Sequence, residues 1–205
     1  MSISQTINGT LRKVPAWPLY ILGALPGIWL FYSAVSGMIG PDPIRPLERG
    51  LGLYGLQFLI AGLAVTPLRR YAGVNLIKFR RAIGLVAFFY IVVHLAVWIG
   101  LDMGLRWEQM GTDILKRPYI TIGMVGFVAM VSLAVTSNNR SVRKLGSALW
   151  QRIHKLTYFA VAAGVIHFVM VQKVWETEPL IYGLIVLGLL ATRLRWAPRR
   201  AARLV

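Results

Sequence analysis

Six long runs of uncharged, mostly apolar residues alternate with short charged segments along the chain. The runs cover residues 17–36, 51–68, 82–101, 118–139, 156–172 and 179–192. A helix needs roughly 17 to 25 such residues to cross the hydrocarbon core, so each of the first five runs is long enough. The sixth run, with fourteen residues, spans the core only if Arg193 and Arg195 extend toward the lipid headgroups. The pattern predicts an all-α integral membrane protein, a bundle of six transmembrane helices.

Charged residues are divided unequally between the connections. All seven Asp and Glu residues follow runs one, three and five, whereas 17 of the 23 Lys and Arg residues precede run one or follow runs two, four and six. Connections rich in Lys and Arg stay in the cytoplasm, so we expect both termini to be cytoplasmic and the acidic connections to lie outside. The net charge of +16 comes from basic residues that are dispersed at the ends of the runs and do not form one basic patch. We therefore expect membrane lipid, and no nucleic acid, as the surrounding partner.

The length and the lack of cysteine limit the remaining possibilities. Most of the 205 residues are used by the six runs, so we expect a single transmembrane domain over residues 1–205 and no separate soluble domain. The segments between the runs look like short connections. A chain without cysteine forms no disulfide, holds no iron–sulfur cluster through thiolates and performs no thiol catalysis.

Three histidines, His94, His154 and His167, lie in or beside the runs. An ionisable side chain in a bilayer is costly and usually faces the interior of the bundle for a functional reason. At 1.5 Å per residue, His94 lies about 20 Å beyond Arg81 and His167 about 22 Å beyond Arg152. His154 is next to charged residues, near the cytoplasmic surface. The spacing predicts that His94 and His167 share one depth in the outer half of the membrane.

Two imidazoles at one depth on neighbouring helices can hold a haem iron from both sides. Ala87 and Ala160, seven residues before His94 and His167, leave room there for a flat ring. Other interpretations are a set of hydrogen-bonding core groups or the proton relay of a proton-coupled transporter. No Asp or Glu lies within a run to extend such a relay, and no third ligand for zinc lies at that depth. A scaffold subunit without chemistry of its own would not need three buried histidines.

Arg80 is a further candidate for cofactor binding. It precedes His94 by fourteen residues, which returns it to within about 40° of the same helix face, at the level of His154. A guanidinium there can pair with a haem propionate, bind another anionic cofactor or lie beside the iron of an inner haem. The alternative is an ordinary basic anchor at the cytoplasmic surface.

Three stretches resemble a known family. They are residues 66–70 (TPLRR), residues 80–85 (RRAIGL) ahead of His94, and residues 150–158 (WQRIHKLTY) ahead of His167. The chain resembles the MsrQ family, also called YedZ, which comprises the haem-binding membrane subunits of bacterial methionine-sulfoxide reductase systems. That family is part of the ferric-reductase-like transmembrane group. The resemblance extends over essentially the whole chain, including its length, the six runs and the three histidines.

The resemblance implies a b-type haem protein of the bacterial inner membrane. Such a protein takes electrons from the quinone pool or a flavin donor and passes them to a periplasmic, molybdopterin-containing subunit that repairs methionine sulfoxide in oxidised proteins. His94, His154 and His167 match the haem-ligand positions of the family. Members of the wider group often hold two haems with four histidines. Here Arg80 stands where the fourth histidine would fall, so the number of haem b groups, one or two, stays open. The resemblance also implies FMN, for which the sequence has no recognisable flavin motif.

Overall fold

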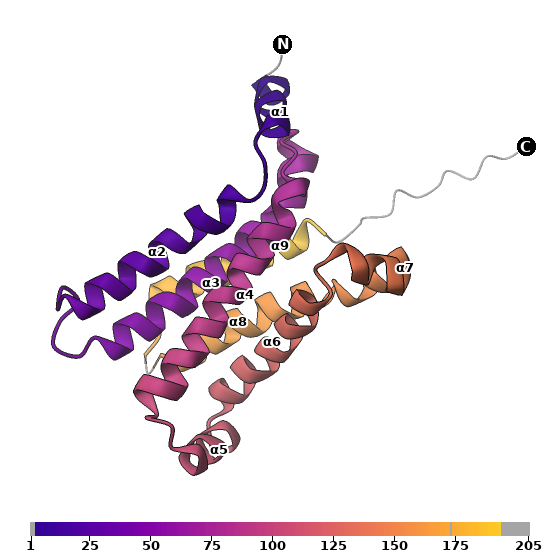
Figure 1. Cartoon of the computed structure of the whole chain (residues 1–205). Coiled ribbons are helices and arrows are strands. Elements are labelled where there is room, and N and C mark those ends of the chain that lie inside the picture. Colours follow the sequence, from indigo (N-terminus) through magenta and orange to yellow (C-terminus); the bar gives the residue numbers. More distant parts are fainter. Residues whose placement is uncertain (1–2, 173, 194–205) are drawn as a thin grey trace, which may run out of the picture.

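Every regular element in the described part of the chain is a helix. The structure is a computed structural model that describes residues 3–172 and 174–193. The helices are α1 (Ile3–Lys13), α2 (Pro18–Val35), α3 (Ile44–Pro67), α4 (Arg80–Val97), α5 (Trp107–Lys116), α6 (Pro118–Val135), α7 (Asn139–Ile153), α8 (Leu156–Val171) and α9 (Thr177–Ala191) (Figure 1). Short turns η1 (Leu68–Ala72) and η3 (Trp98–Asp102) extend α3 and α4, and η2 (Ile77–Phe79) precedes α4.

Four helical segments are long and apolar enough to cross a membrane. These segments are α2, α3 together with η1, α4 together with η2 and η3, and α6. The helices α7 and α8, which are bent by 42° relative to each other, supply a fifth candidate if they count as one broken span. The shorter α9 has 15 residues. The all-helical membrane class is thus confirmed with four or five candidate spans, and the sixth span and the side of the termini remain predictions.

The segments outside the runs, described from the sequence as short connections, contain three helices of their own, α1, α5 and α7. The fourth run also ends earlier than predicted. The hydroxyl groups of Thr136 and Ser137 donate to the carbonyls of Ser132 and Leu133, both at 2.7 Å, and so satisfy the last turn of α6. Asn138 then accepts from the amide of Ser141 and begins α7 as its N-cap. Uncharged polar residues therefore end the helix inside an uncharged run.

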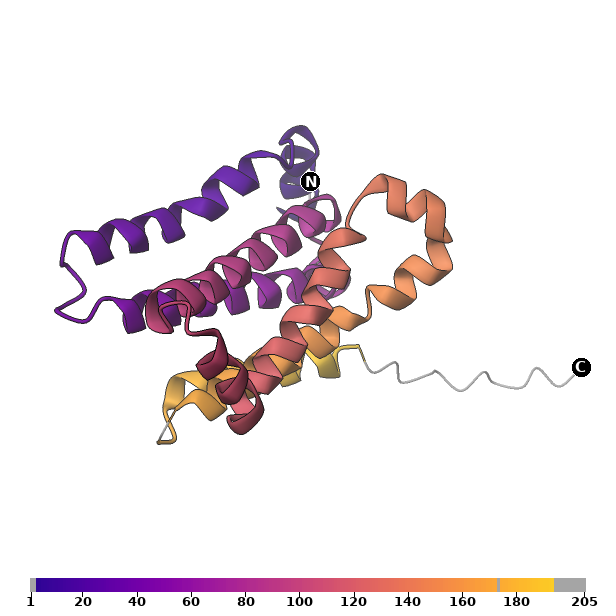
Figure 2. The ribbon, with the colours of Figure 1, turned by 60° about the horizontal axis from the view of Figure 1, so that its bottom comes forward.

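The core lies where α3, α4, α6, α8 and α9 meet. α3 packs along α4, α6 packs along α8, and α8 also contacts α3 and α9. One buried cluster joins residues of all five helices, among them Leu63, Ala87, Ala160 and Val161. Ala87 and Ala160, the two small residues that precede His94 and His167 by seven positions, therefore lie on the interior faces of α4 and α8. Figure 2 shows α2 lying outside α3 and α4.

A tyrosine hydroxyl joins α2 to α4. Pro26 interrupts the hydrogen bonds of α2, since proline has no amide hydrogen. Beside it, the buried Tyr90 of α4 inserts its hydroxyl, which accepts from the Gly27 amide at 2.9 Å and donates to the Gly23 carbonyl at 2.6 Å. Backbone groups in a bilayer must be paired within the protein. Tyr90 bridges the amide and the carbonyl of this turn, so both groups are paired within the protein.

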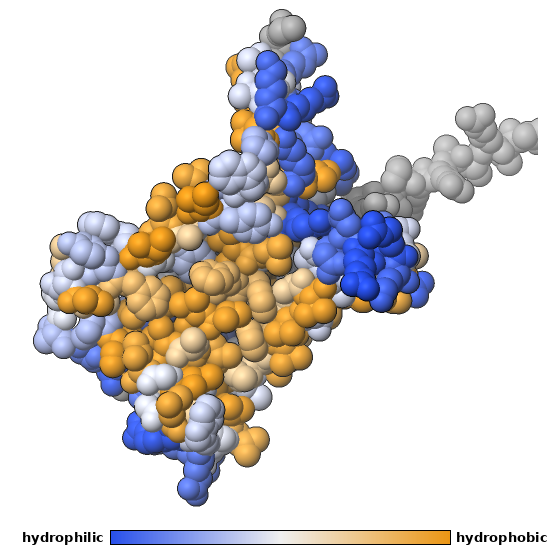
Figure 3. Space-filling view, in the orientation of Figure 1, coloured by the Kyte–Doolittle hydropathy of each residue, from blue (hydrophilic) through white to orange (hydrophobic). Residues whose placement is uncertain are grey.

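The polar residues gather at the two ends of the bundle. Figure 3 shows a hydrophobic middle, with hydrophilic groups over α1 and α7 at one end and around α5 at the other. The acidic residues lie at the end opposite α1 and α7, in the α2–α3 connection and in or beside α3, η3, α5 and the start of α9: Asp42, Glu48, Asp102, Glu108, Asp113, Glu176 and Glu178. We call this the acidic end and the other the basic end. Of the basic residues counted above, Lys173, Arg195, Arg199, Arg200 and Arg203 lie outside the described residues.

Candidate functional site

His94 of α4 and His167 of α8 face each other near the acidic end. The centroids of the two rings are 6.3 Å apart, and the ring planes are inclined by 79°. Both side chains are partly buried. The structure therefore brings together, on neighbouring helices, the two histidines for which the sequence predicts a common depth.

Each of the two rings is held through Nδ1 by a backbone carbonyl. His94 Nδ1 lies 2.8 Å from the carbonyl oxygen of Glu48, and His167 Nδ1 lies 2.8 Å from that of Tyr119. A carbonyl oxygen only accepts, so Nδ1 carries the proton in the neutral ring and donates it. The lone pair is then on Nε2. This is the arrangement that fixes the tautomer and orientation of metal-ligating histidines.

A glycine stands one helical turn after each of these carbonyls. A Cβ at Gly52, four residues after Glu48, would lie 3.2 Å from Nδ1 of His94. A Cβ at Gly123, four residues after Tyr119, would lie 2.9 Å from Nδ1 of His167. The missing side chains let both rings approach the helix backbone. Sequence reasoning did not find these glycines, although their spacing from the histidine-binding carbonyls is identical.

The separation of the two rings matches that of two imidazoles holding one metal from both sides. Metal–nitrogen bonds of roughly 2 Å, with each ring centre about 1 Å behind its nitrogen, would place the centroids about 6 Å apart. Among the described residues, no group of three His, Cys, Asp or Glu side chains is arranged to hold a metal ion. Structural zinc needs four ligands, whereas haem iron receives four of its own from the macrocycle. Two protein nitrogens therefore suit haem better than a free ion.

His154 lies apart from the pair, in the break between α7 and α8 at the basic end. Trp150 stacks on its ring at a centroid distance of 3.8 Å, and Trp150 Nε1 donates to the carbonyl of Thr136 at 2.9 Å. His154 Nε2 lies 3.2 Å from the Thr136 hydroxyl, which donates its own proton to Ser132. Nε2 must then be the donor in this contact. The nitrogen left free in the other two histidines is thus engaged in His154.

Arg80, the remaining candidate from the sequence, is the first residue of α4 and is half-buried. Its positive charge acts on His154 and on Arg193. It therefore lies at the level of His154, as its spacing predicts, and away from the histidine pair. The sequence predicts that Arg193 extends toward the headgroups; in the structure, its Nη2 donates to the carbonyl of Leu63 at 2.6 Å. That carbonyl faces Pro67, which has no amide hydrogen to offer it.

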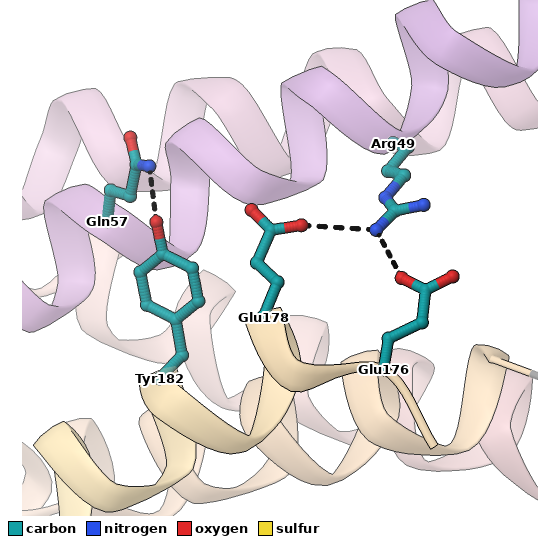
Figure 4. Close-up of polar contacts among 5 residues, drawn as sticks. All are labelled: Arg49, Gln57, Glu176, Glu178 and Tyr182. Atoms are coloured by element: carbon teal, nitrogen blue, oxygen red, sulfur yellow. Dashed lines mark hydrogen bonds and ion pairs between the residues drawn. The ribbon is translucent and has the colours of Figure 1, made fainter. Parts of the chain in front are cut away.

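A group of polar contacts beside the pair ties α3 to α9 (Figure 4). Arg49 Nη2 donates to Glu176 at 2.7 Å and to Glu178 at 3.1 Å, and its guanidinium lies over the ring of Phe168, next to His167 in sequence. Further along the same two helices, the Gln57 amide donates to the Tyr182 hydroxyl at 2.7 Å. These pairs could not be predicted from the sequence, because their partners are more than 120 residues apart. They hold the short α9 against the helix whose backbone binds His94.

Comparisons with known proteins agree with the motifs. Residues 50–165 match the family described as ferric reductase like transmembrane component. A relative from Brucella anthropi is 49% identical over 178 residues, which cover 87% of this chain and 80% of the relative. Relatives from Brucella ovis and Brucella canis are each 47% identical with the same coverage. All three are named protein-methionine-sulfoxide reductase heme-binding subunit MsrQ. The chain belongs to the MsrQ family of ferric-reductase-like membrane proteins.

Proposed function

We propose that this chain is the membrane electron-transfer subunit of a methionine-sulfoxide reductase system and binds haem b between His94 and His167. The names of the relatives, heme-binding subunits of protein-methionine-sulfoxide reductases, support this role. The observation that carries the proposal is the histidine pair itself, with ring centroids 6.3 Å apart and both Nδ1 atoms bound to backbone carbonyls. A bound haem supplies the reversible one-electron change of its iron.

The protein contributes orientation and an apolar environment. The carbonyls of Glu48 and Tyr119 hold the rings and make Nε2 a better donor to a metal. His94 and His167 come from α4 and α8, which meet different partners, α3 and α6, through the two glycines. Rigid helices on both sides keep the two nitrogens in place, because neither ring depends on a loop for its position.

One haem at this pair is the stoichiometry that the residues support best. His154 is the candidate ligand for a second, inner haem and Arg80 its candidate neighbour. The hydrogen bond between His154 Nε2 and Thr136 would have to be replaced before that nitrogen bound iron. FMN is proposed from the family resemblance alone.

We further propose a single domain over residues 1–205 with six spans in the bacterial inner membrane and both termini in the cytoplasm. The excess of Lys and Arg at the basic end supports this orientation. The histidine pair, bound to the backbone of Glu48, then lies toward the periplasm. Electrons would enter from quinone or a flavin donor and leave at the acidic end. The acceptor would be a periplasmic, molybdopterin-containing subunit, in which methionine sulfoxide is reduced.

The test starts from the visible spectrum of the purified protein. We expect a Soret band and reducible α bands, which neither a proton-coupled transporter nor a scaffold would show. The haem is then reduced chemically in proteoliposomes of known orientation, and the reductase subunit with methionine sulfoxide is added on one side. We expect reoxidation when they meet the acidic end. A protein without haem bands, purified from haem-replete cells, would contradict the proposal; equal reoxidation from the basic end would contradict the direction.

A further inference from the structure

Two half-buried arginines lie at the basic end of the bundle, and neither has a carboxylate partner among the described residues. Arg80 begins α4, and Arg193 follows the last turn of α9. Their positive charges repel one another, and Tyr158 of α8 interacts with both. Within the described residues, the Arg80 side chain forms no hydrogen bond or ion pair. The cluster thus concentrates positive charge partly removed from water.

The contacts of Arg193 leave its charge uncompensated. Nη2 donates to the carbonyl of Leu63, and Nη1 donates to the Tyr158 hydroxyl at 3.4 Å, with the guanidinium 5.7 Å from the centre of that ring. Both acceptors are neutral. The third donor, Nε, is buried and has no acceptor among residues 3–172 and 174–193. Arg193 therefore has a buried N–H group without an acceptor and a full positive charge.

The chain itself cannot supply the missing negative side chain. All seven Asp and Glu residues lie at the acidic end, and residues 194–205 contain neither. A buried charge is costly unless it is paired, so two such charges at one place indicate a ligand of opposite charge. The exposed bases of the same end need no such ligand because water solvates them.

We propose that Arg80 and Arg193 form a binding site for an oxyanion, a carboxylate or a phosphate, carried by a molecule in the membrane. Guanidinium groups bind both anions through paired hydrogen bonds, and the Tyr158 hydroxyl can donate another. Two sources present this chemistry at such a depth: the propionate of an inner haem, and the headgroup of an anionic phospholipid between helices. The propionate source rests on the proposed haem function, and the phospholipid source does not.

The test compares Arg80→Gln and Arg193→Gln with the matched control Arg81→Gln, which removes an exposed arginine of the same helix turn. Binding of phosphatidylglycerol is counted by native mass spectrometry of the detergent-solubilised protein. Haem content and midpoint potential are measured by pyridine haemochrome assay and optical redox titration. Thermal unfolding checks that each variant is folded.

Loss of a charge-assisted contact should weaken the ligand about tenfold or more in both Gln variants and leave the control unchanged. Weaker phosphatidylglycerol binding with unchanged haem identifies the phospholipid. A lost second haem, or a shifted potential with the His94–His167 haem still present, identifies the propionate. Wild-type lipid binding, haem content and potential in a folded Arg80→Gln protein would overturn the site. Arg193→Gln also leaves the Leu63 carbonyl without its donor. If that protein does not fold as the wild type does, the Arg80→Gln protein alone tests the site.

Discussion

Gly123 and His167 are in such close contact that a Cβ at position 123 would lie 2.9 Å from the Nδ1 atom of the imidazole. The same Nδ1 donates to the carbonyl of Tyr119, one helical turn before the glycine. Ring, carbonyl and glycine therefore form one unit: the carbonyl sets the direction of the ring, and the glycine gives it the space to reach that carbonyl.

The first prediction follows from this contact. Gly123→Ala should push the His167 ring from its carbonyl and weaken haem binding by about 10–100-fold, the usual cost of losing an orienting partner. Gly52→Ala should have a smaller effect, because the corresponding distance to His94 Nδ1 is 3.2 Å. Gly84→Ala is the control, since a Cβ there meets nothing within 4 Å. Haem titration into the apoprotein measures all three, and equal affinities would contradict this role of the glycines.

The second prediction concerns the ligands themselves. His94→Ala and His167→Ala should each lose most of the haem, because water is a poor substitute for an axial nitrogen in an apolar site. His154→Ala should keep the haem of the pair, since its ring lies at the opposite end beside Trp150. Pyridine haemochrome assays give the content, and full occupancy in both of the first two variants would exclude the pair as ligands.

The meeting of His94 and His167 could be predicted from the sequence because depth along a helix is a local quantity. Counting residues from a charged helix end needs only the rise of the helix. The glycines that position the rings could not be found in this way. Gly52 and Gly123 matter because of which helices are neighbours, and an unaligned glycine in a membrane helix is equally typical of simple helix packing.

The helices in the connections were missed for a different reason. Run length detects segments that are apolar on all sides, whereas α5 and α7 contain many charged and polar residues. α7 also contains Gly146 with a φ of 73°, which breaks the regular helical period inside it. The contact of Arg193 could not be predicted from the sequence either. Its partner, the Leu63 carbonyl, is 130 positions away, and it is free to accept only because Pro67 has no amide hydrogen.

The third prediction is about the joint between α2 and α4. Tyr90→Phe leaves the Gly27 amide and the Gly23 carbonyl without their shared hydroxyl, in a place where water does not replace it. The free energy of unfolding should fall by about 1–3 kcal/mol for these unpaired groups. Tyr32→Phe, at an exposed position of α2, should change it little. Denaturant unfolding in detergent measures both; matching curves would mean that the hydroxyl does not stabilise the joint.

A fourth prediction concerns the attachment of α9. Arg49→Gln removes the ion pairs with Glu176 and Glu178, whose side chains are 37% and 44% exposed. Pairs that water reaches this easily contribute little, so we expect a loss of about 1 kcal/mol or less that shrinks further at high salt. Arg45→Gln, from a still more exposed pair with Asp42, is the control. A large loss that does not depend on salt would point to the Phe168 contact instead.

The last prediction tests orientation, on which the direction of electron flow depends. Reporter fusions after Glu108 and Glu176 should be active in the periplasm, because both residues lie at the acidic end, while fusions after Arg143 and Arg203 should report the cytoplasm.

Arg143 is the most informative position, since it lies in α7, between α6 and the bent start of α8. If α7 and α8 form one broken span and α9 also crosses, all four reporters agree with six spans. Periplasmic activity at Arg143 would overturn the six-span topology. The histidine pair would face the cytoplasm only if the reporters after Glu108 and Glu176 were cytoplasmic at the same time. A cytoplasmic Arg143 with a periplasmic Arg203 would instead mean that α9 does not cross, leaving the pair and its outward electron path in place.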